Sequence, residues 1–134
     1  MRFMLIRKAD ADTEAGVIPT PEFFAAMGNY NEELMRAGVL LQGEGLMASS
    51  KGARVKFSNG KPRTITDGPF TETKELIAGF TMIQVRSKEE AIEWVKRWPS
   101  IDSDAEIEIR QLFEADDFGP NFTDGRSHAE NSIA

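Results

Sequence analysis

The chain has no cysteine and only one histidine among its 134 residues. The lack of cysteine excludes disulfides, thiol nucleophiles, iron–sulfur clusters and thiolate-bound zinc. It is also consistent with a reducing compartment. The single histidine, His128, lies in the polar C-terminal part of the sequence. The body of the chain therefore lacks the usual pair of a nucleophile and an imidazole base.

Long apolar runs are missing as well. No segment approaches the ~20 consecutive apolar residues that cross a bilayer. The first apolar run, Phe3 to Ile6, is too short for a signal peptide, and no small-residue cleavage site follows it. We therefore expect a cytoplasmic protein that makes no use of a membrane.

An excess of basic residues is the third absence. The formal net charge is −6 and the pI is about 4.9, so the chain gains nothing from the phosphate backbone of nucleic acids. We expect no direct nucleic-acid binding. The sequence also has no phosphate-binding loop, no dinucleotide fingerprint and no diagnostic spacing of metal ligands. We predict neither a cofactor nor a metal site.

The residues that are present fit one domain large enough to bury a core. Hydrophobic periodicity predicts several strands and two helices, the helices opening near residues 20 and 87. A polar loop is expected over residues 9–17. The predicted strands are residues 3–6, 39–46, 53–57, 62–66, 78–85 and 105–113.

Local signals place the helix ends and one turn. Thr20 is a good N-cap for the first helix, and Gly38 ends it. Ser87 and Glu90 have the spacing of a capping box at the start of the second helix. Asn59-Gly60, between two short strands, is the strongest short signal for a β-hairpin because both residues tolerate positive φ.

The order of elements is β-α-β, a hairpin, then β-α-β. This order predicts an α+β ferredoxin-like fold with the helices on one face of the sheet. Met4 and Ile6 would then form an apolar patch on the other face. A second copy of the chain is the simplest cover, so we predict a face-to-face homodimer. The domain is expected to span residues 1–116, followed by a polar, loosely ordered tail at residues 117–134.

Residues 66–74 hold the densest group of unusual residues and are the predicted functional region. Gly68 and Pro69 specify a tight turn after a strand. Asp67 precedes this turn. Its carboxylate can act as a general base if it is kept dry, or it can accept backbone N–H bonds in an Asx-turn. Phe70 offers an apolar wall for a ligand.

Four charged residues are further candidates for ligand contacts. Glu72 and Lys74 either orient a polar ligand or form an ordinary surface ion pair. Arg7, at the end of the first strand, either binds a carboxylate or lies at a wet strand end. Glu44, between two glycines, either faces a pocket or lies on a solvated edge.

Four segments of the chain, in the same order, resemble the YCII-related superfamily and its DGPF-domain branch. The branch takes its name from the tetrapeptide that here is Asp67-Gly68-Pro69-Phe70. The matching segments lie at residues 4–6, 37–46, 66–75 and 90–94. Together they are spread over roughly residues 1–112, so the resemblance concerns nearly the whole body of the chain.

The resemblance implies a dimeric α/β-barrel fold and much less about activity. Most DGPF-domain proteins have no assigned reaction, and many are named as transcription-associated because they occur near sigma factors. Some YCII-related relatives are enzymes that act on small ring compounds, including dehydrochlorinases, and are similar in a His–Asp pair within a cleft. Asp67 matches that aspartate. The histidine has no counterpart in the matching region, since His128 lies beyond it.

Two functions remain open on the sequence alone. One is a bacterial dimeric module that binds a small molecule in a cleft near Asp67 and serves a regulatory system associated with a sigma factor. The other is a small-molecule lyase, similar to a dehydrochlorinase, in which Asp67 is the acid–base group. The sequence names neither the ligand nor a reaction.

Overall fold

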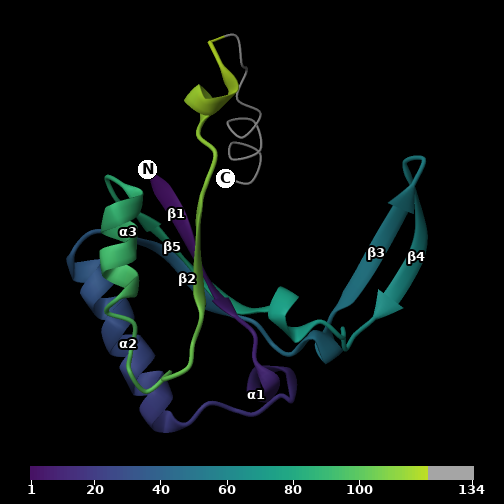
Figure 1. Ribbon diagram of the computed structural model, residues 1–134, viewed down its shortest axis with the longest axis horizontal. Helices are drawn as coiled ribbons and strands as arrows, with labels where there is room; N and C mark the ends of the chain where they lie inside the picture. The colour runs from purple at the N-terminus through teal and green to yellow at the C-terminus, as the bar shows by residue number, and fades with distance from the viewer. Residues whose placement is uncertain (121–134) are drawn as a thin grey trace, which may run out of the picture.

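The computed structural model describes residues 1–120 and contains two separate β-sheets, with helices beside the larger one (Figure 1). The helices and strands are β1 (Arg2–Lys8), α1 (Ala11–Glu14), α2 (Pro21–Arg36), β2 (Leu40–Gly45), β3 (Ala53–Ser58), β4 (Lys61–Asp67), β5 (Ile77–Gln84), α3 (Lys88–Val95) and β6 (Ile107–Gln111). Short 3₁₀ turns are η1 (Ser49–Lys51), η2 (Thr73–Glu75) and η3 (Ala115–Phe118). The expected α+β class is confirmed.

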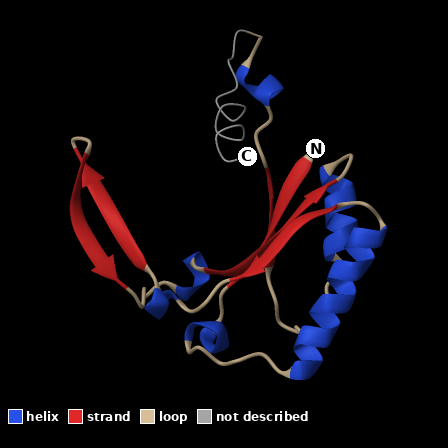
Figure 2. Cartoon of the chain, turned by 180° about the vertical axis from the view of Figure 1, so that it is seen from behind, coloured by secondary structure: helices blue, strands red, loops and turns tan. Residues whose placement is uncertain are grey.

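The larger sheet has the strand order β2-β5-β1-β6, and all its neighbouring strands are antiparallel. Helices α2 and α3 lie side by side on one face of this sheet (Figures 1 and 2). The face away from these helices carries Met4 opposite Met82 and Ile6 opposite Phe80. These side chains alternate with the buried ones along the strands, as the period of a β-strand requires.

The core lies between the sheet and the two helices. Phe3, Leu5 and Ile83 from the sheet are fully buried against Leu34 of α2. Tyr30 of α2 is also buried, and its hydroxyl donates to the carbonyl oxygen of Trp94 on α3 at 2.6 Å. This bond ties the two helices together above the sheet.

Most of the predicted helix and turn signals are found in the structure. The Thr20 hydroxyl accepts a bond from Phe23 N at 3.2 Å, and Gly38 follows α2 with φ of 73°. Ser87 caps α3 by accepting from Glu90 N at 3.1 Å. The predicted capping box is incomplete, however, because the Glu90 carboxylate accepts from Arg86 N instead of Ser87 N.

The loop expected over residues 9–17 contains a helix that the sequence analysis missed. Helix α1 is only four residues long, which is too short for a periodic apolar stripe. It forms because Asp10 and Thr13 make a reciprocal capping box, with Asp10 Oδ1 accepting from Thr13 N at 2.9 Å. These bonds make part of the segment regular where an open loop was predicted.

Strands β3 and β4 form a two-stranded hairpin that is not hydrogen-bonded to the larger sheet. We call residues 53–67 the arm. Its turn is the predicted one, with φ of 53° at Asn59 and 75° at Gly60. The arm stands away from the sheet on the side opposite α2 and α3 (Figures 1 and 2). This separation of the hairpin from the sheet was not predicted.

Most of the predicted tail, residues 121–134, lies outside the part of the chain that the structure describes, and so does His128. Within residues 1–120, no helix is long and apolar enough to span a membrane.

Candidate functional site

A cleft of about 610 Å³ lies between α2 and the edge of the sheet formed by β2 and β5. Its lining is mostly apolar and comes from α2, from the segment before α2, and from the segment after β2. Apolar residues of the lining include Val17, Ile18, Phe23, Met27, Met47 and Phe80. A concave, largely apolar cleft of this size is typical of sites for small organic molecules.

Glycines on two paired strands account for the space in the cleft. Gly43 and Gly45 of β2 and Gly79 of β5 all line it, and Gly45 is directly opposite Gly79 in the ladder. A Cβ placed on Gly45 would meet no atom within 4 Å, whereas one on Gly79 would lie 2.9 Å from Glu44 O. Gly79 therefore permits the close approach of the strands, and Gly45 leaves the cleft open.

A buried ion pair lies at the cleft. Asp102 accepts from Arg7 through both carboxylate oxygens, at 3.1 Å from Nε and in a second, shorter bond from Nη2. Trp98 Nε1 donates to the same carboxylate at 3.0 Å. The two charged side chains are only 13% and 8% exposed, and all three residues line the cleft. Hydrogen bonding to Asp102 raises the pKa of Arg7, so its charge is permanent.

Arg7 is further bound on its other side. Its Nη1 donates to the carbonyl oxygen of Lys8 at 2.7 Å and to Asp10 Oδ2 at 3.1 Å. The pKa of Asp10 is lowered, first by the hydrogen bond from Thr13 N and also by Arg7. Two carboxylates of the protein thus neutralise Arg7. A ligand carboxylate would have to displace one of them.

Asn31 of α2 is the polar residue in the cleft wall that lacks a partner. Its Oδ1 atom is buried and has no hydrogen bond to any described residue. A buried acceptor without a partner costs about 1–3 kcal/mol. Because Oδ1 is buried, a ligand in the cleft would reach it only if the Asn31 side chain turned; a hydrogen bond made in that way would recover part of that cost.

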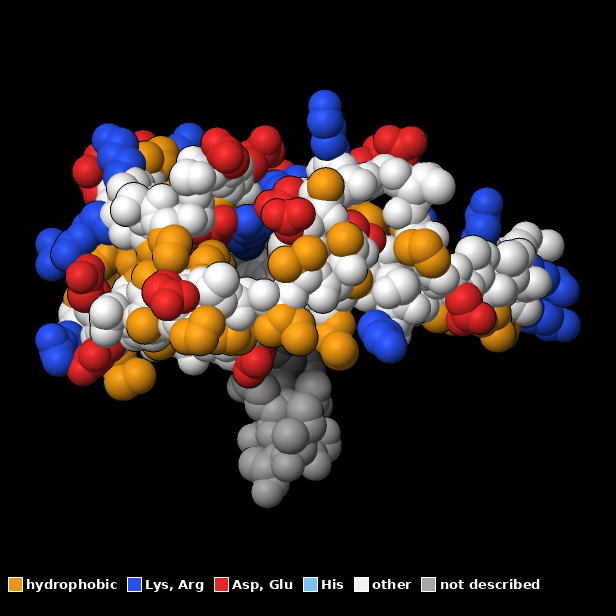
Figure 3. Space-filling view, turned by 90° about the horizontal axis from the view of Figure 1, so that it is seen from below, with side chains coloured by type: hydrophobic (Ala, Val, Ile, Leu, Met, Phe, Trp, Pro, Cys, Tyr) orange, Lys and Arg blue, Asp and Glu red, His pale blue; other side chains and the backbone are white. Residues whose placement is uncertain are grey.

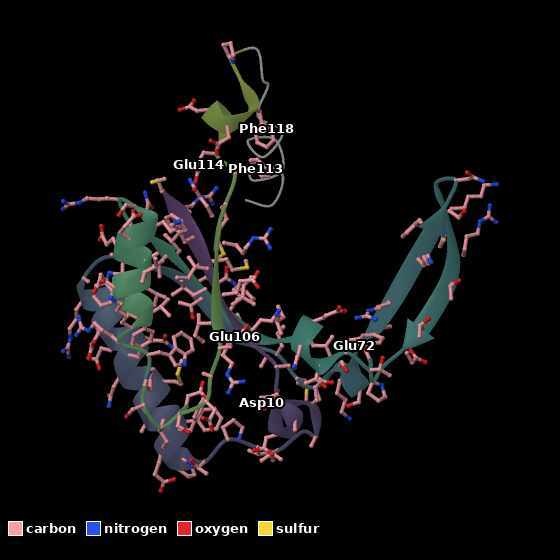
Figure 4. All side chains as sticks on the ribbon, in the orientation of Figure 1. Asp10, Glu72, Glu106, Phe113, Glu114 and Phe118 are labelled. Atoms are coloured by element: carbon pink, nitrogen blue, oxygen red, sulfur yellow. The ribbon has the colours of Figure 1, made fainter. Side chains whose placement is uncertain are left out.

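The structure brings two of the predicted site residues to the cleft and leaves four outside it. Arg7 and Glu44 line the cleft. Asp67 is exposed at the end of β4, and Phe70 and Lys74 are not part of the lining. Glu72 lies at the foot of the arm, away from the helices (Figure 4). The four candidates outside the cleft are therefore Asp67, Phe70, Glu72 and Lys74.

The turn from Asp67 to Phe70 nevertheless contacts Ser49, a residue whose neighbours form part of the cleft wall. A Cβ on Gly68 would lie 1.7 Å from Ser49 O, so no larger residue fits there. Phe70 N donates to Ser49 Oγ at 3.0 Å, and Ser49 in turn donates through both N and Oγ to the Glu14 carboxylate. The neighbours of Ser49 on both sides line the cleft. The turn therefore holds η1 in place.

Three residues of the site were not found from the sequence. Asp102 and Trp98 lie more than 90 positions from Arg7 in the sequence, and no local pattern connects them. Asn31 lies on a helix whose stripe indicates core packing. The pair of glycines around Glu44 was a usable signal for the cleft, because glycines on a strand leave space where side chains would otherwise lie. In residues 1–120, no cluster of three or more His, Cys, Asp or Glu residues is placed to hold a metal ion.

The family described as YCII-related domain matches residues 1–116. Curated proteins gave no match. One similar solved structure is the 5-chloro-2-hydroxyhydroquinone dehydrochlorinase of Burkholderia phenoliruptrix in complex with 2,5-dihydroxybenzoquinone. It is 16% identical, has a TM-score of 0.46, and is matched over 85% of this chain and 95% of that chain.

Proposed function

The chain belongs to the YCII-related domain family, as its sequence predicted, and we propose that it is a dimeric module that binds a small, uncharged, largely apolar molecule in the cleft beside α2. The observation that carries this proposal is the unpartnered Asn31 Oδ1 in the wall of a mostly apolar cleft. The apolar lining supplies affinity, and Asn31 supplies one directional contact.

The preference for an uncharged ligand follows from the state of Arg7. Its guanidinium is already bound by Asp102 and Asp10, and Glu44 adds a further negative charge to the lining. Lys51 is the other basic residue of the lining, and it is exposed. Among the described residues, Lys51 is the lining cation without an ion pair, and because it is exposed it would offset only part of the hydration that an entering carboxylate loses.

The dimer is proposed from the open face of the larger sheet. Met4, Ile6, Phe80 and Met82 lie on the face that α2 and α3 leave uncovered. The strand order β2-β5-β1-β6 supports the ferredoxin-like arrangement. Two such sheets packed face to face would give the dimeric α/β barrel, and they would bury this apolar stripe.

Two roles are proposed for a chain that binds such a ligand: a regulatory role and, as the alternative, an enzymatic one. A ligand-binding module fits a sensing role in a system associated with a sigma factor. A lyase that uses Asp67 as its acid–base group would need the ligand to reach the end of β4, outside the cleft of the same chain. An Asp67→Asn variant that keeps ligand binding but loses all turnover would identify this alternative.

The binding proposal is tested by titrating matched pairs of ring compounds. Benzamide and naphthamide can donate a hydrogen bond to Asn31 Oδ1, whereas benzoate and naphthoate have the same shape and a negative charge. We expect calorimetry to show binding of the amides and at least about tenfold weaker binding of the carboxylates, the equivalent of about 1.4 kcal/mol. Carboxylates that bind as tightly as the amides would contradict the proposal.

Two variants locate the binding. Asn31→Leu keeps the size of the side chain and removes the unpartnered acceptor, so we expect unchanged or higher stability and about tenfold weaker amide binding. Gly45→Val places a side chain in open space within the cleft, so it should abolish binding without unfolding the chain. Amide binding that survives both substitutions would place the site elsewhere.

A further inference from the structure

The arm presents an apolar face that no described part of the chain covers. Val55 and Ile65 are directly opposite each other in the hairpin, and Phe57 follows Val55 by two positions on the same strand, just past a shift in the pairing register after Lys56. Their exposed fractions are 49%, 73% and 61%, respectively. An apolar cluster of this kind on a projecting element is typical of an interaction surface.

An isolated two-stranded hairpin is only marginally stable in water, and two further contacts extend this one at its foot. The Arg54 guanidinium stacks over the Phe70 ring at 3.8 Å from its centroid, and Gly68 N donates to Gly52 O at 3.0 Å. Both contacts join residues of the hairpin to the segments next to it in the chain. Six residues of β3 give it a reach of about 20 Å at about 3.3 Å per residue.

The arm also differs in charge from the rest of the chain. It holds four basic residues and one acidic residue, which is a net charge of +3, whereas the other residues hold 12 basic and 21 acidic ones, a net charge of −9. Figure 3 shows the arm projecting from one end of the molecule with basic side chains gathered at its tip. A basic hairpin is thus carried by an acidic body.

We propose that the arm binds a second copy of this chain. Its apolar face would be buried against the partner, and its basic residues would lie beside the acidic body of that partner. The acidic body of a second copy provides the charge that complements the arm. The arm stands on the side of the sheet that α2 and α3 leave uncovered, so it extends around the face used by the proposed dimer. The inference rests on that dimer and adds the arm to its interface.

The test is sedimentation velocity of the full chain over a dilution series. A triple variant, Val55→Thr, Phe57→Thr and Ile65→Thr, removes the apolar face of the arm. Threonine preserves strand propensity, and all three positions are exposed, so the core is untouched. We expect the dimer Kd to rise by at least about tenfold, because each exposed apolar group lost from an interface weakens it. Met35→Gln, at a 65% exposed methionine of α2, is the matched control and should leave Kd unchanged.

A charge variant provides an independent measurement. Lys56→Glu with Arg63→Glu changes the net charge of the arm from +3 to −1, so the dimer should weaken at low salt and recover as salt screens the repulsion. A third variant, Met4→Lys on the open sheet face, separates the two ideas. Dissociation by Met4→Lys alone would support the face-to-face dimer and overturn the role of the arm. A monomeric wild type would overturn both.

Discussion

At the scale of single residues, Gly68 shows how one residue of the Asp67–Phe70 tetrapeptide can be explained by the lack of room for a side chain. The Cβ of any other residue would lie 1.7 Å from Ser49 O, far closer than any non-bonded contact allows. The glycine of the tetrapeptide is therefore required by the backbone of a neighbouring turn. The residue is part of the support of the cleft wall and lies outside the cleft itself.

Asn31 shows the opposite case, since no residue in the described part of the chain binds its side-chain oxygen. A leucine or methionine would pack more favourably at a half-buried position on α2. The cost of the unpartnered atom is consistent with a role in ligand binding, because functional sites often contain polar groups that the free protein leaves unsatisfied.

Tyr30 gives a prediction about pH. Burial raises the pKa of Tyr30 to about 12, above the value of about 10 in the unfolded chain. The native state therefore holds the proton more tightly, and its contribution to stability is complete below pH ~10 and is lost as the pH rises toward ~12. We expect stability to fall by about 2–3 kcal/mol over this window, measured by urea unfolding.

The matched control for that prediction is Tyr30→Phe, which removes the ionisable group and its bond to Trp94. This variant should show a flatter pH profile over the same window. Because Tyr30 is the only tyrosine of the chain, the ultraviolet absorbance of its phenolate reports its titration directly. A midpoint near pH 10 in the folded protein would contradict the account.

At the scale of elements, three short segments far apart in sequence are joined at Ser49. Glu14 of α1 accepts two hydrogen bonds from Ser49, and Ser49 accepts one from Phe70 N. Each segment is too short to be stable alone. The structure of this corner therefore depends on the network, and residues on both sides of Ser49 line the cleft.

Ser49→Ala should loosen this corner. The substitution leaves Phe70 N without its acceptor, which costs about 1–3 kcal/mol. We expect hydrogen exchange at the Phe70 amide to become faster by about tenfold, while amides of the buried sheet strands exchange as before. Ser50→Ala is the control, because the Ser50 side chain makes no hydrogen bond to a described residue and lies next to Ser49. Equal exchange at Phe70 in the two variants would contradict the proposed network.

The elements also show what could be predicted from the sequence. Long periodic segments such as α2 and β5 were predicted closely, because burial against one core produces their patterns. Helix α1 was missed because four residues cannot show a period. The separation of the arm was missed because an alternating hairpin has the same pattern whether it joins a sheet or projects from it. Asp102 was missed because its contact with Arg7 is made only by the tertiary fold.

At the scale of the whole molecule, residues 1–120 leave two apolar surfaces uncovered. One is the open face of the larger sheet, and the other is the apolar face of the arm. Both lie on the side away from α2 and α3. A symmetric dimer would cover both with a single partner, and because Phe80 belongs to both the open face and the lining of the cleft, the partner would lie next to the cleft.

The most direct test of the proposed function is methyl NMR of the methionines during titration with naphthamide. Met27 and Met47 line the cleft, Met4 and Met82 lie on the open sheet face, and Met35 is exposed elsewhere on α2. We predict that the methyl signals of Met27 and Met47 shift together and saturate, while that of Met35 does not move. Shifts confined to Met4 and Met82, or equal shifts at Met35, would contradict a binding site in this cleft.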